Sequence, residues 1–402
     1  MAAGSLIFAV NGKRESSMKD FEFYNPVKIV FGREQLAKLP EQIAAGTKVM
    51  LLYGGGSIKR NGVYKEITRA LKDYELFEFG GIEPNPSYET CMRAVEAVAE
   101  TGSGFLLAAG GGSVIDAAKF IAAAAVYKKG DPWDILSKME PVEEALPLGT
   151  VLTLPATGSE MNKNSVMSRK STNEKFAFSS PAVFPRFSLL LPEAAASLPP
   201  EQVANGVVDA FIHVTEQYVT YPVNAVLQDR MAEAVLLTLV EEGPKAVEDP
   251  SSYGPMSNLM WSATMALNGL LSCGVPGDWS VHAIGHELTA LHNIDHARTL
   301  AIVQPGIWEV LIEQKIEKLV QYGERVWGIT DGTPEQRAHA AINATTDLFE
   351  SLGVKTRLSD YGVGSDTIET IAKRFEERKW VAIGDRRLTT PDVVREALKC
   401  RL

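Results

Sequence analysis

Alternation between strand-type and helix-type segments is the feature that most restricts the fold of this 402-residue chain. Short apolar runs occur in the segments 27–32, 48–57, 76–82, 104–113, 148–160 and 186–192. Segments with helical spacing, for example 86–101 and 113–127, lie between several of them. This order is typical of a parallel sheet covered by helices, so we expect an α/β domain here.

The pattern changes after Ser-Leu-Pro-Pro at 197–200. From there to Leu402 the chain shows long stretches with helical spacing, including 201–219, 227–241, 256–272 and 279–292. We therefore expect an α/β domain over residues 18–197 and an all-helical domain over residues 198–402. Residues 1–17 are interpreted as an N-terminal extension or an artificial leader, with Met18 as a plausible natural start.

Composition excludes several classes of protein. The net charge of −10 argues against nucleic acid or an anionic membrane surface as the main partner. No stretch approaches the roughly 20 apolar residues that span a bilayer. The three cysteines, Cys91, Cys273 and Cys400, form no C-x-x-C pair, which favours a reducing cytoplasm over a disulfide framework.

Two copies of Gly-Gly-Gly-Ser follow apolar runs, at 54–57 and at 110–113. Small residues between a strand and a helix let backbone N–H groups converge on a phosphate. Neither copy matches the common nucleotide-binding patterns, and two plain tight turns remain the alternative. The second copy opens directly into a helical pattern, so Gly111, Gly112 and Ser113 are the better candidates for a pyrophosphate site.

The first turn also indicates which dinucleotide binds. An NAD site commonly offers an acidic residue to the ribose hydroxyl at this place. Residues 53–60 contain no acidic residue, and they end in Lys59 and Arg60. A ribose that carries a 2′-phosphate suits this turn better, so we expect NADP(H).

Histidines cluster in the second half. Five of the six lie between residues 213 and 296. Asp209 and His213 are spaced i, i+4, on one face of a predicted helix, and His282, His286, His292 and His296 follow. Each histidine alone could be an ordinary structural residue. Together, a carboxylate and several imidazoles favour a site for Fe(II), Zn(II) or Mn(II). A protease motif H-E-x-x-H is excluded, because position 290 is Ala290.

These motifs resemble the iron-containing (group III) alcohol dehydrogenases, and within them the branch of NADPH-dependent aldehyde reductases and butanol dehydrogenases. The resemblance runs from about Phe21 to the C-terminus. It rests on the segments FGGIEPNP at 79–86, GGGSVID at 110–116, LTLPATGSE at 152–160, NGVVDAFIH at 205–213, and 282–296.

The resemblance implies a dehydroquinate synthase-like fold, in which a dinucleotide-binding α/β domain is followed by a helical domain and the metal lies between them. The implied metal ligands are Asp209, His213, His282 and His296. His286 is then the candidate for the substrate pocket or a proton route, and His292 is interpreted as structural.

The resemblance also assigns the coenzyme residues and an assembly. Members that use NAD carry an aspartate near the first turn, and this chain departs from them. A homodimer is the family-level expectation. The implied coenzyme contacts are Gly54, Gly55, Gly56 and Ser57 at the adenosine ribose, Pro84 and Asn85 at the adenosine end, Gly111, Gly112, Ser113 and Asp116 at the pyrophosphate, Thr153, Thr157 and Asn162 near the nicotinamide, and Lys175 at a ribose.

The expected activity is reversible reduction of aldehydes to primary alcohols by NADPH, with Fe2+ or Zn2+ as Lewis acid. One rival is a metal-dependent lyase of the dehydroquinate synthase type, and another is an NADH-preferring alcohol dehydrogenase. A metal-dependent hydrolase or a pure nucleotide-binding module explains fewer of the motifs. The lyase would need several Lys and Arg near the metal. The chain instead offers apolar residues around the histidines, namely Trp261, Leu267, Leu270, Leu271, Val275, Trp279 and Ile284.

Overall fold

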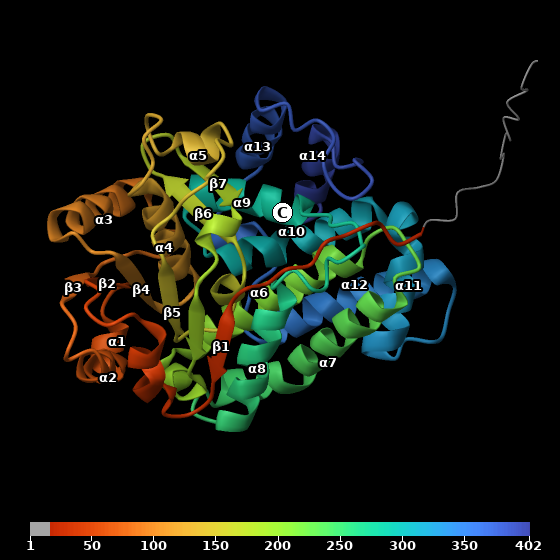
Figure 1. Cartoon of the computed structure of the whole chain (residues 1–402). Helices are drawn as coiled ribbons and strands as arrows, with labels where there is room; N and C mark the ends of the chain where they lie inside the picture. Colours follow the sequence, from red (N-terminus) through yellow and green to blue (C-terminus); the bar gives the residue numbers. More distant parts are fainter. Residues whose placement is uncertain (1–16) are drawn as a thin grey trace, which may run out of the picture.

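The computed structural model describes residues 17–402 (Figure 1). The segment interpreted as an extension or leader, residues 1–17, thus lies outside the described residues except for Ser17. From β1 onward the red-to-yellow part of the chain forms the half with the sheet, and the green-to-blue part forms the helical half. The red segment before β1 runs along the helical half, where the N–H of Lys19 donates to the carbonyl of Gly274 at 2.9 Å.

A six-stranded sheet is the framework of the first half. Every neighbouring pair in it is parallel, in the order β1-β8-β5-β4-β2-β3, which confirms the predicted parallel sheet. The strands are mostly apolar because helices cover both faces, and β2 and β4 carry no charged residue. Their bounds are β1 Lys28–Phe31, β2 Val49–Tyr53, β3 Leu76–Phe79, β4 Phe105–Gly110, β5 Leu148–Leu152 and β8 Phe187–Leu190.

Alternate residues of the strands feed two apolar layers. In β2, Met50 and Leu52 join the layer under α3 and α4, whereas Val49 and Leu51 face α2 and the 3-10 helix η1. The bounds on this half are η1 Gln35–Gln42, α1 Ser57–Arg60, α2 Val63–Ala70, α3 Tyr88–Thr101, α4 Gly112–Ala124, α5 Asp134–Ser137, η2 Ser159–Met161, η3 Pro181–Val183 and η4 Pro192–Ser197.

An antiparallel hairpin, β6 (Asn164–Arg169) and β7 (Glu174–Ser179), was not among the predicted strands. Its turn passes through Asn173, which adopts a positive φ of 51°. The hairpin packs on α4 and on α9 of the second half. It therefore bridges the two halves, a role that its short strands, which lack a continuous apolar run, do not reveal.

The second half is all-helical, as predicted, and the segments 201–219, 227–241, 256–272 and 279–292 correspond to α6 to α9. The last strand of the sheet ends at Leu190, and α6 begins at Pro200. Nothing between these two residues fixes a domain boundary, so the boundary between residues 197 and 198 remains our proposal. The bounds are α6 Pro200–Tyr218, α7 Val226–Glu248, α8 Tyr253–Ala266, α9 Ser280–His292, α10 His296–Val310, α11 Ile312–Trp327, α12 Pro334–Ser351, η5 Ser359–Tyr361, α13 Asp366–Glu377 and α14 Pro391–Lys399.

Helix α6 is the central element of this half and is almost wholly buried. It lies against the loop that follows β5: a Cβ on Gly206 would stand only 2.2 Å from the carbonyl oxygen of Pro155. Thr264 of α8 also donates a hydrogen bond to Glu160 in η2. These contacts fix α6 and α8 against the carboxyl edge of the sheet, where α/β proteins bind ligands.

Within residues 17–402, no helix is both long enough and apolar enough to cross a membrane.

Candidate functional site

One face of α6 carries three acidic or imidazole side chains at i, i+4 and i+7, namely Asp209, His213 and Glu216. This spacing brings them nearly into line along the helix. Asp209 and His213 are buried, with exposures of 3% and 4%. The face points toward α9 and α10, which carry the other histidines of the cluster.

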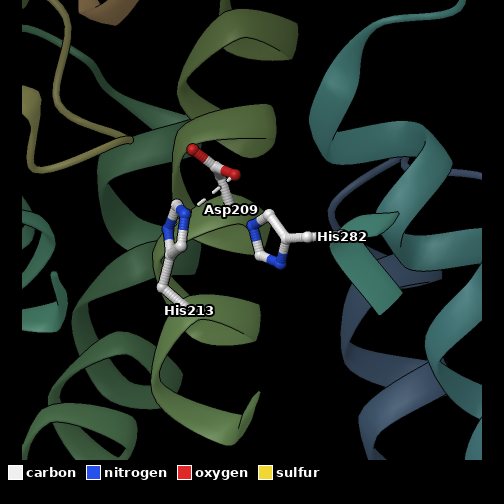
Figure 2. Close-up of side chains that lie close together, drawn as sticks. All are labelled: Asp209, His213 and His282. Atoms are coloured by element: carbon white, nitrogen blue, oxygen red, sulfur yellow. Dashed lines mark ion pairs between the residues drawn. The ribbon is translucent and has the colours of Figure 1, made fainter. Parts of the chain in front are cut away.

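Ligand-type atoms of Asp209, His213 and His282 lie within 4.8 Å of one another. Figure 2 shows these side chains converging from two helices, two from α6 and one from α9. His296 of α10 joins them, since its Nε2 lies 3.9 Å from Oδ1 of Asp209. The structure thus brings together all four residues that the family resemblance implies as metal ligands.

Helices α9 and α10 approach closely because of Gly285. A Cβ at this position would stand 2.8 Å from Cδ2 of Leu300 on α10. The rings of His282 and His296 are consequently 5.2 Å apart between centroids. His286, one turn along α9, lies 5.1 Å from the ring of His296.

Among residues 17–402, several buried atoms of this cluster find no hydrogen-bond partner, namely Oδ1 of Asp209, Nδ1 of His213, Nε2 of His282, Nε2 of His286 and Nδ1 of His296. Buried polar atoms are normally paired, so a concentration of unpaired ones needs an explanation. A carboxylate oxygen and imidazole nitrogens form a donor set that suits a divalent metal ion. The residues at this place therefore fit a metal.

The pKa values of the four histidines also favour a metal site. Burial lowers the pKa of His213 and of His282 to about 4. It also holds the pKa of His286 and of His296 well below the ordinary value. The imidazoles are thus neutral at pH 7, and a neutral imidazole is the form that binds a metal.

Glu216 is a site residue that the sequence interpretation missed. Its carboxylate hydrogen-bonds Nδ1 of His282 and leaves Nε2 of that ring facing Asp209 and His213. Burial, and next the nearby Asp278 carboxylate, raise the pKa of Glu216 to about 8. The available signal was its spacing, three residues after His213 on the same helix face.

A cavity of about 480 Å³ opens beside the histidines. His286 lines it, and its assignment to the substrate pocket or to a proton route remains a prediction. The lining is mainly apolar and includes one cation. It consists of Asn85, Pro86, Gly112, Ser113, Asp116, Leu136, Met139, Thr157, Ser159, Asn162, Asn164, Val166, Lys175, Phe176, Ala177, His213, Leu267, Trp279, His282, Ala283, His286, His296 and Trp380.

Of the apolar residues that the sequence places near the metal, Leu267 and Trp279 line this cavity. Leu271 and Ile284 belong instead to the helical core. Trp261 is 41% exposed and packs edge-on against Phe31. The prediction was too broad, because helical periodicity does not distinguish a core face from a pocket face. His292 is exposed, and its Nε2 lies 2.9 Å from Oγ1 of Thr367, outside the cavity.

The turn at 110–113 connects β4 directly with α4, as predicted. Gly112 lies so close to Thr157 that a Cβ would stand 2.3 Å from its Oγ1. A Cβ on Gly111 would likewise stand only 3.0 Å from Cβ of Leu154. The glycines thus let the turn pack against the loop after β5, and they leave Gly112 and Ser113 in the wall of the cavity.

The turn at 54–57 lies at the end of β2, the strand next to β4, and outside both described cavities. Gly56 has a φ of 87°, and space around Gly55 is open. Lys59 is engaged by Glu78, whose carboxylate lies 3.1 Å from its Nζ, while Arg60 is exposed. Arg60 is consequently the cation more available to a ligand at this turn.

Asp116 and Asn162 are fixed by a buried network that centres on Lys119, another residue that the sequence interpretation missed. The Lys119 ammonium donates to Ser159 Oγ at 2.8 Å and to Asn162 Oδ1 at 2.9 Å. Ser159 in turn donates to Asp116. Burial lowers the pKa of Lys119 to about 8. Lys119 therefore positions the polar wall of the cavity from behind, without lining it.

Lys175 and Asn85 separate this cavity from a second one of about 540 Å³. Nζ of Lys175 donates to Oδ1 of Asn85 at 2.8 Å, and burial lowers the pKa of Lys175 to about 8. Asn85 lines both cavities, and Pro84 lines the second. Thr153 is buried, its N–H donates to the carbonyl of Gly110, and it is not among the residues that line either described cavity.

Two family models match the chain. The model described as iron-containing alcohol dehydrogenase matches residues 26–192. The model for the C-terminal part of the Fe-containing alcohol dehydrogenase family matches residues 203–397. Together they cover both halves of the fold.

Individual relatives match over nearly the full length. The NADPH-dependent aldehyde reductase YqhD of Escherichia coli K12 is 53% identical over 380 residues, 94% of this chain and 98% of that protein. A crystal structure of E. coli K-12 YqhD superposes with a TM-score of 0.95 and 51% identity, covering 96% of this chain and 100% of the other. The NADH-dependent butanol dehydrogenase A of Thermotoga maritima superposes with a TM-score of 0.92 and 36% identity, over 96% and 99% of the two chains.

Proposed function

This chain belongs to the iron-containing alcohol dehydrogenase family, and we propose that it reduces aldehydes reversibly to primary alcohols with NADPH and a divalent metal. One observation carries the proposal. Ligand atoms of buried Asp209, His213 and His282, unpaired in the described structure, meet beside a mainly apolar cavity, and Gly112 and Ser113 of the glycine turn line the same cavity. A metal, a dinucleotide and an aldehyde can thus share one space.

We propose Asp209, His213, His282 and His296 as the metal ligands. Their support is the 4.8 Å cluster of the first three and the 3.9 Å approach of His296 to Asp209. A divalent ion held there supplies a Lewis acid that polarises the carbonyl oxygen. We further propose Fe2+ or Zn2+ as that ion, since a carboxylate with three imidazoles suits both.

The coenzyme contacts are proposed from the two glycine turns and from the residues that line the cavities. Gly111 is the N-cap of α4, and Gly112 and Ser113 are its first two residues, so their N–H groups belong to the helix start, where an anion is favoured. Thr157 and Asn162 line the cavity between this turn and the histidines, which suits the nicotinamide. The turn at 54–57 then meets the adenosine ribose, with Pro84 and Asn85 along the adenosine end and Lys175 at a ribose.

The reaction needs a proton as well as a hydride, because the aldehyde oxygen becomes a hydroxyl. His286 lines the cavity and its buried Nε2 has no partner in the described structure, so it is our candidate for carrying this proton to the oxygen. The apolar wall of Leu267, Trp279 and Phe176 excludes water and holds the carbon chain.

The lyase alternative is not favoured by this cavity. A substrate with a phosphate and a carboxylate requires several cations, and Lys175 is the only Lys or Arg in the described lining. A preference for NADH is disfavoured by the turn at 54–57, which lacks an acidic residue.

We also propose a homodimer. The segment before β1 exposes Phe21, Phe23 and Tyr24, at 53%, 44% and 72%. It continues into β1, which lies at the edge of the sheet. An exposed aromatic arm beside an unpaired strand edge suits burial against a second copy. Sedimentation of the purified chain tests this: a monomer at micromolar concentration contradicts it.

A cytoplasmic location is proposed as well, because Cys91, Cys273 and Cys400 are all free thiols in the described structure. Fractionation of the source cells tests it.

The activity is tested by following NADPH absorbance with butanal, in chain stripped of metal and then reloaded with Fe2+ or Zn2+. We expect oxidation of NADPH only after reloading, and slower oxidation of NADH. Equal rates with and without metal would refute the metal-assisted scheme. An absence of turnover with every aldehyde and either coenzyme would refute the activity itself.

A further inference from the structure

Helix α9 begins without a capping side chain of its own. The residue before it, Trp279, has a φ of 61° and makes no side-chain cap. The first N–H groups of a helix need partners from elsewhere. Asp278 accepts from the N–H of Ser280 at 3.0 Å.

The next two N–H groups are satisfied from another helix. Oε1 of Glu216 accepts from the N–H of Val281 at 2.8 Å, and Oε2 accepts from the N–H of His282 at 3.2 Å. Oε2 is also the partner of Nδ1 on the His282 ring. A single buried carboxylate of α6 thus holds both the start of α9 and the ring of a proposed ligand.

This arrangement determines which ring nitrogen of His282 is available. A divalent cation held by His282 would favour the ionised form of the nearby Glu216 carboxylate. In that form both oxygens accept, and Oε2 accepts a hydrogen bond from Nδ1–H of the imidazole, which keeps its proton. Nε2 then carries the lone pair, and Nε2 is the buried nitrogen without a partner in the described structure. The partner of one ring nitrogen sets the state of the other.

We propose that Glu216 is a positioning residue of this enzyme: it fixes the ring and the tautomer of His282 and sets the distance between α9 and the ligands on α6. The inference rests on the proposed function, because it needs His282 to be a metal ligand. Its physical basis is that Asp209, His213 and Glu216 share one rigid helix, so the carboxylate that orients His282 moves with the other two ligands.

Glu216 is itself held in place. Its carbonyl oxygen accepts from the N–H of Asp278 at 2.9 Å. Asp278 is bound by the buried ammonium of Lys315 at 2.6 Å. Lys315 also lies 3.4 Å from Asp385 and donates to the carbonyl of Val219 at 3.0 Å, just after α6. The loop that starts α9 is thereby tied to the same end of α6 that carries Glu216.

A glutamine at 216 preserves the shape but not the two acceptors. Its amide offers one oxygen and one NH2 group. The NH2 group would then face either the N–H of Val281 or the Nδ1 side of His282. In the first case the start of α9 loses a partner, and in the second the ring is driven toward the tautomer whose Nε2 carries a proton.

The test compares Glu216→Gln with a matched control, Glu233→Gln. Glu233 is equally buried at 3% and pairs with Tyr218, Arg230 and Arg325, away from the histidines. Zinc affinity is measured by competition with a chromophoric chelator, NADPH binding by fluorescence, and folding by the melting midpoint of the zinc-free chains. We expect Glu216→Gln to bind zinc about 10- to 100-fold more weakly, with NADPH affinity retained. Glu233→Gln should keep wild-type zinc affinity even where its melting midpoint falls.

Two results overturn the inference. The first is zinc affinity in Glu216→Gln equal to that of the wild type. The second does not need Glu216→Gln and therefore serves if that variant does not fold. 15N NMR of histidine-labelled, zinc-loaded wild-type chain should find a proton on Nδ1 of His282, and a spectrum of His282→Gln identifies which signal belongs to this residue. A proton on Nε2 instead contradicts our inference. Wild-type chain that binds no zinc refutes the metal site and the proposed function, which is a different outcome.

Discussion

Nε2 of His296 lies 3.9 Å from Oδ1 of Asp209, and this oxygen has no hydrogen-bond partner in the described structure. The separation exceeds a hydrogen bond but suits two ligands of one ion. The buried carboxylate thus faces imidazoles on two sides, since Nδ1 of His213 is also 3.9 Å away. The arrangement is the one expected of ligands around a common point.

Replacing His296 with alanine should therefore weaken metal binding. We expect His296→Ala to lose about 100-fold or more in zinc affinity, together with aldehyde reduction, because a direct ligand matters more than the groups that orient it. Zinc retained after dialysis, measured by mass spectrometry, checks this. The control is His292→Ala, which changes an exposed imidazole bonded to Thr367. Full zinc content in His296→Ala would remove His296 from the ligand set.

The coenzyme preference can be tested at Gly55. A side chain fits there, since nothing lies within 4 Å of a Cβ at this position. Gly55→Asp should repel a 2′-phosphate and shift the ratio of kcat/KM for NADPH and NADH by about tenfold or more toward NADH, given roughly 1.4 kcal/mol per tenfold change and the double charge of the phosphate. Gly55→Asn separates charge from size, because it has nearly the same shape. An equal shift in both variants would assign the effect to sterics.

The sheet and the helical half were predictable because their signals are local. The runs that became β2, β4 and β5 are predominantly apolar, and each is followed by a glycine-bearing turn or loop that marks its end. The hairpin of β6 and β7 was missed, since its strands gain stability from packing on α4 and α9 rather than from an apolar pattern of their own.

The residues of the candidate site were likewise predictable only in part. Asp209 and His213 are a visible i, i+4 pair, and the family resemblance supplied His282 and His296. Glu216 and Lys119 went unnoticed because an acid and a lysine within helical patterns usually indicate a solvated face. Both are buried, Glu216 at 3% and Lys119 at 0% exposure, and their partners are distant in the sequence. Only the packing of α6 on α9 and of α4 on η2 reveals what they hold.

Coenzyme binding should depend on pH through Lys175. Burial lowers the pKa of Lys175 to about 8, so the side chain is charged at pH 7 and mostly neutral at pH 9. If its charge holds the coenzyme, the Kd for NADPH should rise by up to about tenfold between pH 7 and pH 9. Fluorescence titration at each pH measures this. Lys175→Met should bind NADPH more weakly at pH 7 and should lack the rise. The same rise in both chains would show that another group is responsible.

The contact between Gly206 of α6 and Pro155 gives a prediction about stability. An added Cβ would stand 2.2 Å from the carbonyl oxygen of Pro155, and the atom that must yield is backbone rather than a flexible side chain. Gly206→Ala should therefore destabilise the chain by about 1–3 kcal/mol, although alanine is otherwise the better residue within a helix. For a domain of this size the melting midpoint should fall by roughly 2–4 °C per kcal/mol.

Gly254 of α8 is the matched control for this change, because nothing lies within 4 Å of a Cβ there. Gly254→Ala should leave the melting midpoint unchanged or raise it, since the helix gains propensity without a clash. The substitution at Gly206 should also lower kcat, because α6 carries Asp209 and His213 while the loop of Pro155 carries Thr157 in the cavity wall. A displaced α6 would shift the proposed ligands Asp209 and His213 relative to Thr157 in the cavity wall. Calorimetry and steady-state kinetics on the two variants measure both effects. A Gly206→Ala chain as stable and as active as the wild type would contradict the prediction, because it would show that α6 can shift without consequence for the site.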